Sequence, residues 1–227
     1  MTPELIHLHE LEGKIVVVVD ILRATSCMTT ALANGVKGII PVATLEECKS
    51  YKDNGFICAA ERGGEPVKGF QLDNSPFSYL DEKLKGKTIA VTTTNGTLAI
   101  TKSLDADEVL VGSFLNLSSI ANYLMSKSNN VVIHCAGWKG QVNTEDTLYA
   151  GALISLLEES FNVEGDGAQL AQNLFESNKS DLLAVVEASG HAKRLAKFNI
   201  LEDIKFCLEI DKYDLVAVLK NGVLEKL

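Results

Sequence analysis

The stretch Asp20-Ile-Leu-Arg23-Ala-Thr25-Ser26 places a carboxylate, a guanidinium and two hydroxyls directly after the apolar run 15–19. A β-branched run as apolar as this one predicts a strand that is buried on both faces of a parallel sheet. Thr25 or Ser26 is expected to cap the helix that follows. Ligands bind at the carboxyl ends of such strands, and helix N-termini attract anions. We therefore predict a site for a negatively charged small molecule, with Asp20 available to hold a metal.

Further loops with unusual polar chemistry are predicted at the same edge of the sheet. Taken alone, each has an ordinary explanation as a helix cap, an exposed ion pair or a buried thiol. Their convergence on one edge favours a common pocket. The residues concerned are Glu61, Arg62, Gly63, Gly64, Thr93, Thr94, Asn95, Gly96, Ser113, Asn116, Cys135, Gly137, Glu145 and Asp146.

The sequence lacks the motifs of several common catalytic and metal-binding sites. There is no Gly-x-x-x-x-Gly-Lys-Ser/Thr, no Gly-x-Ser-x-Gly and no pair of histidines at metal spacing. His191, in a polar helix start, is interpreted as part of a solvated face. The remaining possibility is a hard-oxygen site that suits Mg²⁺, with bidentate contacts from Arg23 and Arg62 to the anion. The expected metal ligands are Asp20, Glu61, Glu145 and Asp146.

Composition narrows the function classes. A net charge of −9 argues against a nucleic-acid partner. No apolar stretch approaches a membrane span, and no leader pattern is present, so no membrane partner is expected. The five cysteines are odd in number and include no Cys-x-x-Cys, which indicates free thiols in a reducing compartment. We expect a cytoplasmic protein that binds a negatively charged small molecule, with homo-oligomer formation left open.

Strands and helices alternate along the chain, which predicts an α/β fold with helices on both faces of a mostly parallel or mixed sheet. We expect one domain over 1–227, in which a weak internal echo suggests similar half-units at 1–87 and 88–227. The expected strands are 15–19, 38–42, 56–59, 88–92, 108–111, 131–135 and 215–219. The expected helices are 25–33, 45–52, 97–102, 117–127, 146–160 and 168–176, with two shorter ones between 180 and 207.

Six ordered motifs resemble those of the 2-phosphosulfolactate phosphatase family. They are Asp20-Ile-Leu-Arg23-Ala-Thr25-Ser26, Glu61-Arg62-Gly63-Gly64, Gly69-Phe70 with Asn74-Ser75-Pro76, Thr92-Thr93-Thr94-Asn95-Gly96-Thr97, Val111-Gly112-Ser113 with Asn116, and Cys135-Ala136-Gly137 with Glu145-Asp146. The resemblance implies a three-layer α/β/α fold and Mg²⁺-dependent hydrolysis of 2-phosphosulfolactate to 3-sulfolactate and phosphate, a step associated with coenzyme M biosynthesis. The expected partner is therefore a small anionic phosphoester substrate. One departure is Gln71 and Asp73, where the family has an acidic residue and then a glycine.

These arguments together lead us to expect three catalytic residues, Asp20, Arg23 and Asp146. The expected substrate-binding residues are Thr25, Ser26, Arg62, Gly63, Gly64, Thr93, Thr94, Asn95, Gly96, Ser113, Asn116, Cys135 and Gly137. Two other functions stay open: a cofactor-independent racemase or isomerase with Cys27 and Cys135 as thiol bases, and a non-catalytic module that binds small anionic metabolites. Whether water or Asp20 attacks phosphorus also stays open.

Overall fold

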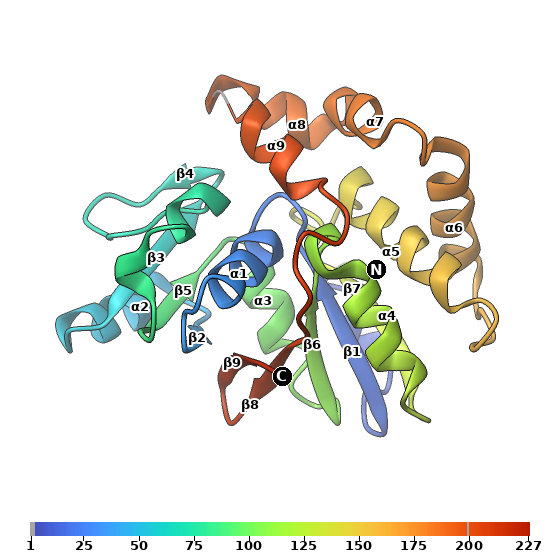
Figure 1. The fold of residues 1–227 in the computed structure, drawn as a ribbon, viewed down its shortest axis with the longest axis horizontal. Coiled ribbons are helices and arrows are strands. Elements are labelled where there is room, and N and C mark those ends of the chain that lie inside the picture. Colours follow the sequence, from blue (N-terminus) through green and yellow to red (C-terminus); the bar gives the residue numbers. More distant parts are fainter. Residues whose placement is uncertain (1–2, 199) are drawn as a thin grey trace.

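The computed structural model describes residues 3–198 and 200–227 of the 227-residue chain. Within these residues, nine strands form one sheet in the order β4-β3-β5-β2-β9-β8-β6-β1-β7 (Figure 1). The strands are β1 (Lys14–Val19), β2 (Gly38–Pro41), β3 (Ile57–Arg62), β4 (Glu65–Pro66), β5 (Thr88–Thr92), β6 (Glu108–Gly112), β7 (Asn130–Cys135), β8 (Ala217–Lys220) and β9 (Val223–Lys226).

The sheet consists of two parallel groups that an antiparallel hairpin joins. In one group β1 lies between β6 and β7, and in the other β5 lies between β2 and β3. The hairpin of β8 and β9 pairs with β6 on one side and with β2 on the other. The expected division into half-units 1–87 and 88–227 does not appear in the sheet, because β1 belongs with β6 and β7, whereas β5 belongs with β2 and β3.

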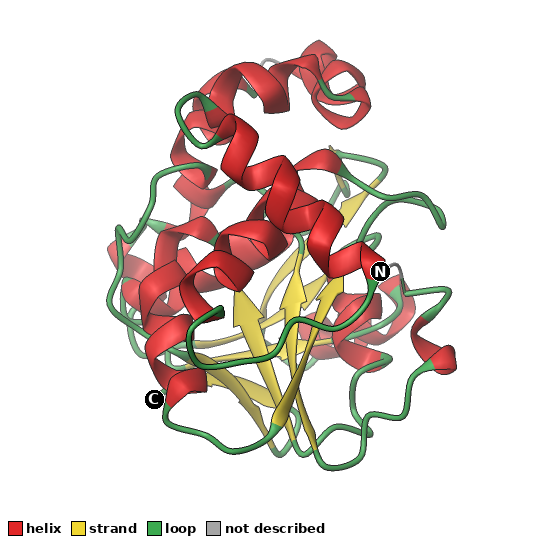
Figure 2. Ribbon diagram, turned by 90° about the vertical axis from the view of Figure 1, so that its right-hand side faces the viewer, coloured by secondary structure: helices red, strands yellow, loops and turns green. Residues whose placement is uncertain are grey.

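Helices cover both faces of the sheet and complete a three-layer α/β/α arrangement, as expected (Figure 2). The helices are α1 (Ala24–Ala33), α2 (Leu45–Asp53), α3 (Gly96–Thr101), α4 (Leu117–Met125), α5 (Thr144–Leu157), α6 (Asp166–Asn178), α7 (Leu182–Ala188), α8 (Gly190–Leu195) and α9 (Leu201–Cys207). Short 3₁₀ turns occur at Ile6–Leu8, Pro76–Tyr79, Glu82–Leu84, Phe114–Asn116 and Ala196–Phe198.

Strand β1 shows how the sequence builds the core. Ile15, Val17 and Val19 pack with side chains of α4 and α5, whereas Val16 and Val18 pack with side chains of α1 and α3 on the opposite face. All five side chains are fully buried. Each such burial stabilises the fold by roughly 1.5–3 kcal/mol, so the chain segment that ends at Asp20 is firmly anchored.

A helical cap, defined here as residues 182–207, contains α7, α8 and α9 and lies at the top of Figure 1. In Figure 2 the arrowheads of the central strands point toward this side of the molecule. The cap packs against the 3₁₀ turn at Pro76–Tyr79 through an edge contact of Phe206 with Phe77, whose ring centroids are 5.1 Å apart. The cap therefore covers the sheet edge at which the parallel strands end.

Several predicted boundaries need correction. Helix α1 begins at Ala24, so Thr25 and Ser26 lie inside its first turn and do not cap it. Their hydroxyls instead donate back to the carbonyl oxygens of Asp20 and Ile21, each at 2.9 Å. The hairpin strand β9 was not anticipated, and the region 180–207 holds three described α-helices rather than two. Among the described residues, no helix combines the length and apolar character needed to span a bilayer.

Candidate active site

Asp20 lies where β1 ends and α1 begins, and the surrounding backbone holds it in place. Thr25 Oγ1 accepts a hydrogen bond from the Asp20 amide at 3.0 Å, and Asp20 Oδ1 accepts one from the Ala24 amide at 3.4 Å. Helix α3 approaches so closely at Gly96 that a Cβ there would lie 2.9 Å from Asp20 Oδ2 and 2.6 Å from the Cβ of Ala24. Glycine at position 96 is therefore a steric requirement of the site.

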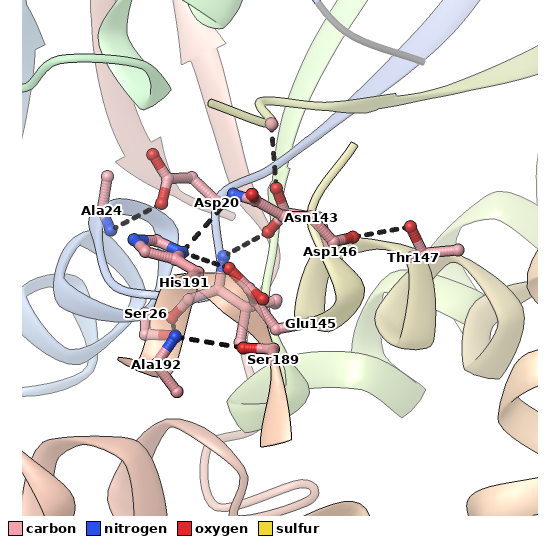
Figure 3. Close-up of polar contacts among 12 residues, drawn as sticks. Asp20, Ala24, Ser26, Asn143, Glu145, Asp146, Thr147, Ser189, His191 and Ala192 are labelled. Carbon is pink, nitrogen blue, oxygen red and sulfur yellow. Dashed lines mark hydrogen bonds and ion pairs between the residues drawn. The ribbon is translucent and has the colours of Figure 1, made fainter. Parts of the chain in front are cut away.

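Asp146, in the first turn of α5, ties three segments together. Its Oδ1 accepts from the Ile21 amide at 2.9 Å, and its Oδ2 accepts from the Gly137 amide at 3.0 Å. The carboxylate thus joins the end of β1, the segment after β7 and the start of α5. Figure 3 shows Asp20 and Asp146 within the same group of polar side chains.

Glu145 and His191 form a second pair beside these carboxylates. Glu145 is fully buried, and its Oε1 is hydrogen-bonded to Nδ1 of His191, which α8 supplies from the cap (Figure 3). Asn143 lies 3.4 Å from the same ring nitrogen through its side-chain amide. The other carboxylate oxygen, Glu145 Oε2, is buried and has no hydrogen-bond partner among the described residues. The sequence analysis placed His191 on a solvated face, and the structure corrects that interpretation.

Burial and the nearby negative charges raise the pKa values of Asp20 and Asp146. Burial raises the pKa of Asp20 to about 6, with His191 acting in the opposite direction and Glu61 adding to the increase. Burial, together with the nearby charges of Glu145 and Asp20, raises the pKa of Asp146 well above its ordinary value. Perturbed carboxylates clustered beneath a cap are typical of a functional site.

The loop after β3 forms a compact network around Glu61. The Glu61 carboxylate accepts from the amide and hydroxyl of Thr94, at 3.0 and 3.1 Å, and from the amide of Gly64. The Gly63 amide donates to Thr94 Oγ1 at 3.0 Å. Arg62 donates to its neighbour's carbonyl, Glu61 O, at 2.6 Å and to Thr92 Oγ1 at 2.8 Å. Glu61 and Arg62 are thus both engaged in holding the loop.

Arg23 is also bonded to another side chain of the protein. Its guanidinium forms an ion pair with Asp203 of the cap, and both side chains are buried. Ser75 donates to the second oxygen of Asp203 at 3.0 Å. Asp203 therefore links the cap to α1 and to the segment that precedes the Pro76–Tyr79 turn. No local sequence pattern indicated Asp203 as the partner of Arg23.

Ser113 and Asn116 use their polar groups inside the fold. The Asn116 side chain accepts from the Ser113 amide at 2.9 Å and donates to the carbonyl of Leu215 at 3.3 Å. The Ser113 hydroxyl donates to Thr29 Oγ1 at 3.1 Å. Both residues are fully buried, so in this conformation they join β6 to the segment that leads into β8.

Thr93 and Thr97 bond to each other across the start of α3. Each backbone amide donates to the other's hydroxyl, at 3.1 and 3.2 Å. Asn95 precedes α3 and makes no side-chain capping bond. Hydroxyl pairing across the turn fixes Gly96 against Asp20, so the threonine-rich motif serves the geometry of the site.

Gln71 and Asp73, where the sequence departs from the family pattern, both form hydrogen bonds within the fold. Gln71 Oε1 accepts from the Cys58 amide at 3.2 Å, and Asp73 Oδ1 accepts from the Ser75 amide at 2.9 Å and from the Ser78 hydroxyl at 2.7 Å. Both side chains thus organise the segment between β4 and the Pro76–Tyr79 turn.

The thiols do not form the pair of bases that a racemase would need. All five cysteines are free and buried. Burial raises the pKa of Cys135 to about 11 and the pKa of Cys27 well above its ordinary value. Cys27 lies in α1 and packs in the core on that face of the sheet, whereas Cys135 packs with Ala150 and Ala171 in a separate cluster. Thiols this reluctant to ionise are poor bases at neutral pH.

The expected metal ligands do not gather into a preformed cage. Among residues 3–198 and 200–227, no group of three or more His, Cys, Asp or Glu side chains is arranged to hold a metal ion. Asp20 and Asp146 lie together, Glu145 is bonded to His191, and Glu61 is bonded to Thr94 and Gly64. What the structure brings together is therefore a carboxylate pair flanked by a carboxylate–imidazole pair.

An α/β enzyme with an oxygen-rich site for an anionic ligand is the class that this fold and site define. The sequence comparisons identify the particular family. The family model for 2-phosphosulpholactate phosphatase matches residues 1–222, and the chain belongs to that family.

Three relatives named "Probable 2-phosphosulfolactate phosphatase" illustrate the similarity. The protein from Caldanaerobacter subterraneus is 43% identical over 219 residues, covering 94% of this chain and 91% of the relative. The protein from Thermotoga maritima is 44% identical over 212 residues, covering 93% and 92%. The protein from Clostridium acetobutylicum is 38% identical over 218 residues, covering 94% and 92%. The similarity therefore extends over nearly the whole chain.

Proposed function

We propose that this chain is a Mg²⁺-dependent phosphatase that hydrolyses 2-phosphosulfolactate to 3-sulfolactate and phosphate. The observation that carries the proposal is the buried pair Asp20 and Asp146 at the carboxyl end of β1, in a chain that matches this family over residues 1–222. Five free cysteines favour a reducing compartment, so we assign the activity to the cytoplasm. The reaction fits a step in coenzyme M biosynthesis.

The residues present fit a magnesium ion. Mg²⁺ is commonly held by one or two carboxylates and by phosphate oxygens of the substrate, and it keeps several waters. Asp20 and Asp146 repel each other while buried, and this repulsion would be relieved by a divalent cation. Glu145, the residue before Asp146, also has a buried Oε2 without a hydrogen-bond partner among the described residues. When bound, Mg²⁺ would neutralise charge on the phosphoryl oxygens.

The chain's own groups have separate tasks in this proposal. Helix α1 begins at Ala24, a few residues after Asp20, so its positive dipole end would stabilise an anionic phosphoryl group bound beside Asp20. Thr25 fixes Asp20 through the backbone. His191 is bonded to Glu145 through Nδ1, so in the protonated ring the Nε2–H would be left to transfer its proton to the leaving oxygen of sulfolactate, which returns the imidazole to its neutral form. The cap that supplies His191 helps to exclude water from the site.

The decisive experiment measures phosphate release from 2-phosphosulfolactate by the purified protein. We expect turnover with Mg²⁺, loss of turnover after chelation, and recovery when Mg²⁺ is restored. The Asp20→Asn variant should lose activity by orders of magnitude while it stays folded. Turnover that survives chelation would contradict the metal requirement, and no phosphate release under any of these conditions would contradict the proposed reaction.

A further inference from the structure

The loop between β7 and α5 holds Trp138 and Lys139 in a tight turn. The Trp138 amide donates to Gln141 O at 2.9 Å, and the Gln141 amide donates to Trp138 O at 3.0 Å. Lys139 and Gly140 have φ values of 48° and 75°, the left-handed pair that a two-residue type I′ hairpin requires. The turn therefore presents Trp138 and Lys139 from a defined backbone and not from a loose loop.

Two cations lie against the Trp138 ring. Cζ of Arg194, from α8, is 4.1 Å from the ring centroid, and Nζ of Lys139 is 4.7 Å from it. Among the described residues, neither Lys139 nor Arg194 forms an ion pair with a carboxylate. Lys139 and Arg194 are both exposed and share one aromatic ring, in a protein whose net charge is −9.

The two positive charges beside Trp138 favour the binding of an anion. Two positive charges that share one ring repel each other, and the attraction of both to a bound anion would offset that repulsion. A guanidinium stacked on an aromatic face still has its N–H edge free for bidentate hydrogen bonds to an oxyanion. Lys139 adds a mobile ammonium. The three side chains therefore have the chemistry of an oxyanion site with a rigid aromatic floor.

The position of the group connects it to the active site. Gly137, directly before Trp138, donates its amide to Asp146. Arg194 lies three residues after His191 on α8, about one helical turn, and His191 is bonded to Glu145. Trp138 and Arg194 thus lie close in sequence to Gly137 and His191, which bond to the carboxylates of the site. Arg23 and Arg62, the arginines that the sequence favoured for anion binding, are already bonded within the fold.

We propose that Trp138, Lys139 and Arg194 form the subsite that binds the sulfonate of the substrate, at a distance from the transferred phosphoryl group. This inference rests on the proposed function, because it assigns the second anionic end of the same substrate. A sulfonate stays ionised at every physiological pH and is weakly hydrated, which matches a weakly hydrated guanidinium on an aromatic face. Binding energy from this remote group helps to position the phosphoryl group.

Trp138 is the only tryptophan of the chain, so its fluorescence reports this site alone. We expect saturable changes in emission when the Mg²⁺-loaded protein is titrated with 3-sulfolactate, and none with lactate at the same concentrations. The Arg194→Gln variant should bind 3-sulfolactate at least about tenfold more weakly, as the loss of a charge-assisted contact implies. Lys193→Gln, on the same helix and exposed, is the matched control and should bind as the wild type does.

A kinetic comparison separates the sulfonate from the other anionic groups. We expect Arg194→Gln to lower kcat/KM at least about tenfold for 2-phosphosulfolactate and less than about twofold for 2-phospholactate, which lacks the sulfonate. Equal losses on both substrates would overturn the assignment, since the residue would then contact a shared group. An active wild type whose fluorescence ignores 3-sulfolactate would also overturn it while leaving the proposed function intact. Failure of the wild type to release phosphate would instead refute the proposed function.

Discussion

Replacing Asp20 by asparagine should make the metal-free protein more stable while it removes activity. The structure explains why. The Asp20 carboxylate is buried near Glu61 and Glu145, and these surroundings raise its pKa from 3.8 to about 6. A carboxyl group with a raised pKa binds its proton more tightly in the folded state than in the unfolded state. The ionised form therefore opposes folding at neutral pH.

The magnitude follows from the pKa change. Each pKa unit corresponds to about 1.4 kcal/mol, so ionised Asp20 should cost the fold about 3 kcal/mol at neutral pH. The stabilising effect of protonation is fully present below about pH 4 and is lost as the pH rises from about 4 to about 6. Asparagine keeps the shape and carries no charge, so the variant should not show this loss.

Urea denaturation in the presence of a chelator provides the measurement. At pH 7.5 we expect Asp20→Asn to exceed the wild type in free energy of unfolding by about 3 kcal/mol, with the two nearly equal near pH 4. Asp53→Asn removes an exposed carboxylate from the end of α2 and serves as the control, with a change within about 0.5 kcal/mol. If the difference between Asp20→Asn and the wild type is the same at both pH values, the reasoning from buried charge is wrong.

Four other changes test separate parts of the structure. Gly96→Ala should abolish phosphatase activity and reduce stability by about 1–3 kcal/mol, because its methyl group would clash with Asp20; a fully active variant would refute the steric argument. Asp203→Asn should destabilise the protein by about 3–5 kcal/mol in thermal unfolding, since it leaves Arg23 buried without its counter-ion; an unchanged midpoint would contradict this. Glu145→Gln should lower kcat far more than it raises KM if Glu145 positions His191, and equal changes in both would argue against that role. Cys135→Ser should keep substantial activity, and capture of a phosphocysteine would refute our view of this thiol as inert.

The sequence was sufficient to predict the architecture because the fold depends on local patterns. The β-branched run 15–19 and the alternation of strands and helices predicted an α/β fold with helices on both faces of the sheet, which is confirmed. The family was also identified correctly from ordered motifs. Strand β9 was not predicted because its segment, Val223–Lys226, is short and contains as many charged as apolar residues. Neither its length nor its periodicity therefore indicates a strand.

The site was harder to predict because its partners come from distant parts of the chain. His191 meets Glu145 across 46 residues, and Asp203 meets Arg23 across 180 residues. Such contacts depend on how the cap docks over the sheet, and the local polar pattern around His191 is the same as that of a solvated helix. For the same reason the sequence could not show that Arg23 is paired with Asp203. The bond of Arg62 to Thr92 depends instead on the pairing of β3 with β5, which no local pattern reveals.

The hairpin of β8 and β9 also has a consequence for biosynthesis. A ribosome makes these two strands after all the others, yet they occupy the middle of the sheet. Until they emerge, β2 and β6 each lack a neighbour, and the nascent chain carries two open strand edges that can pair with other chains. Folding of the sheet is thus completed only after Val223–Lys226 has been synthesised. A ribosome that stalls before residue 217 releases a chain with both parallel groups and no means to join them.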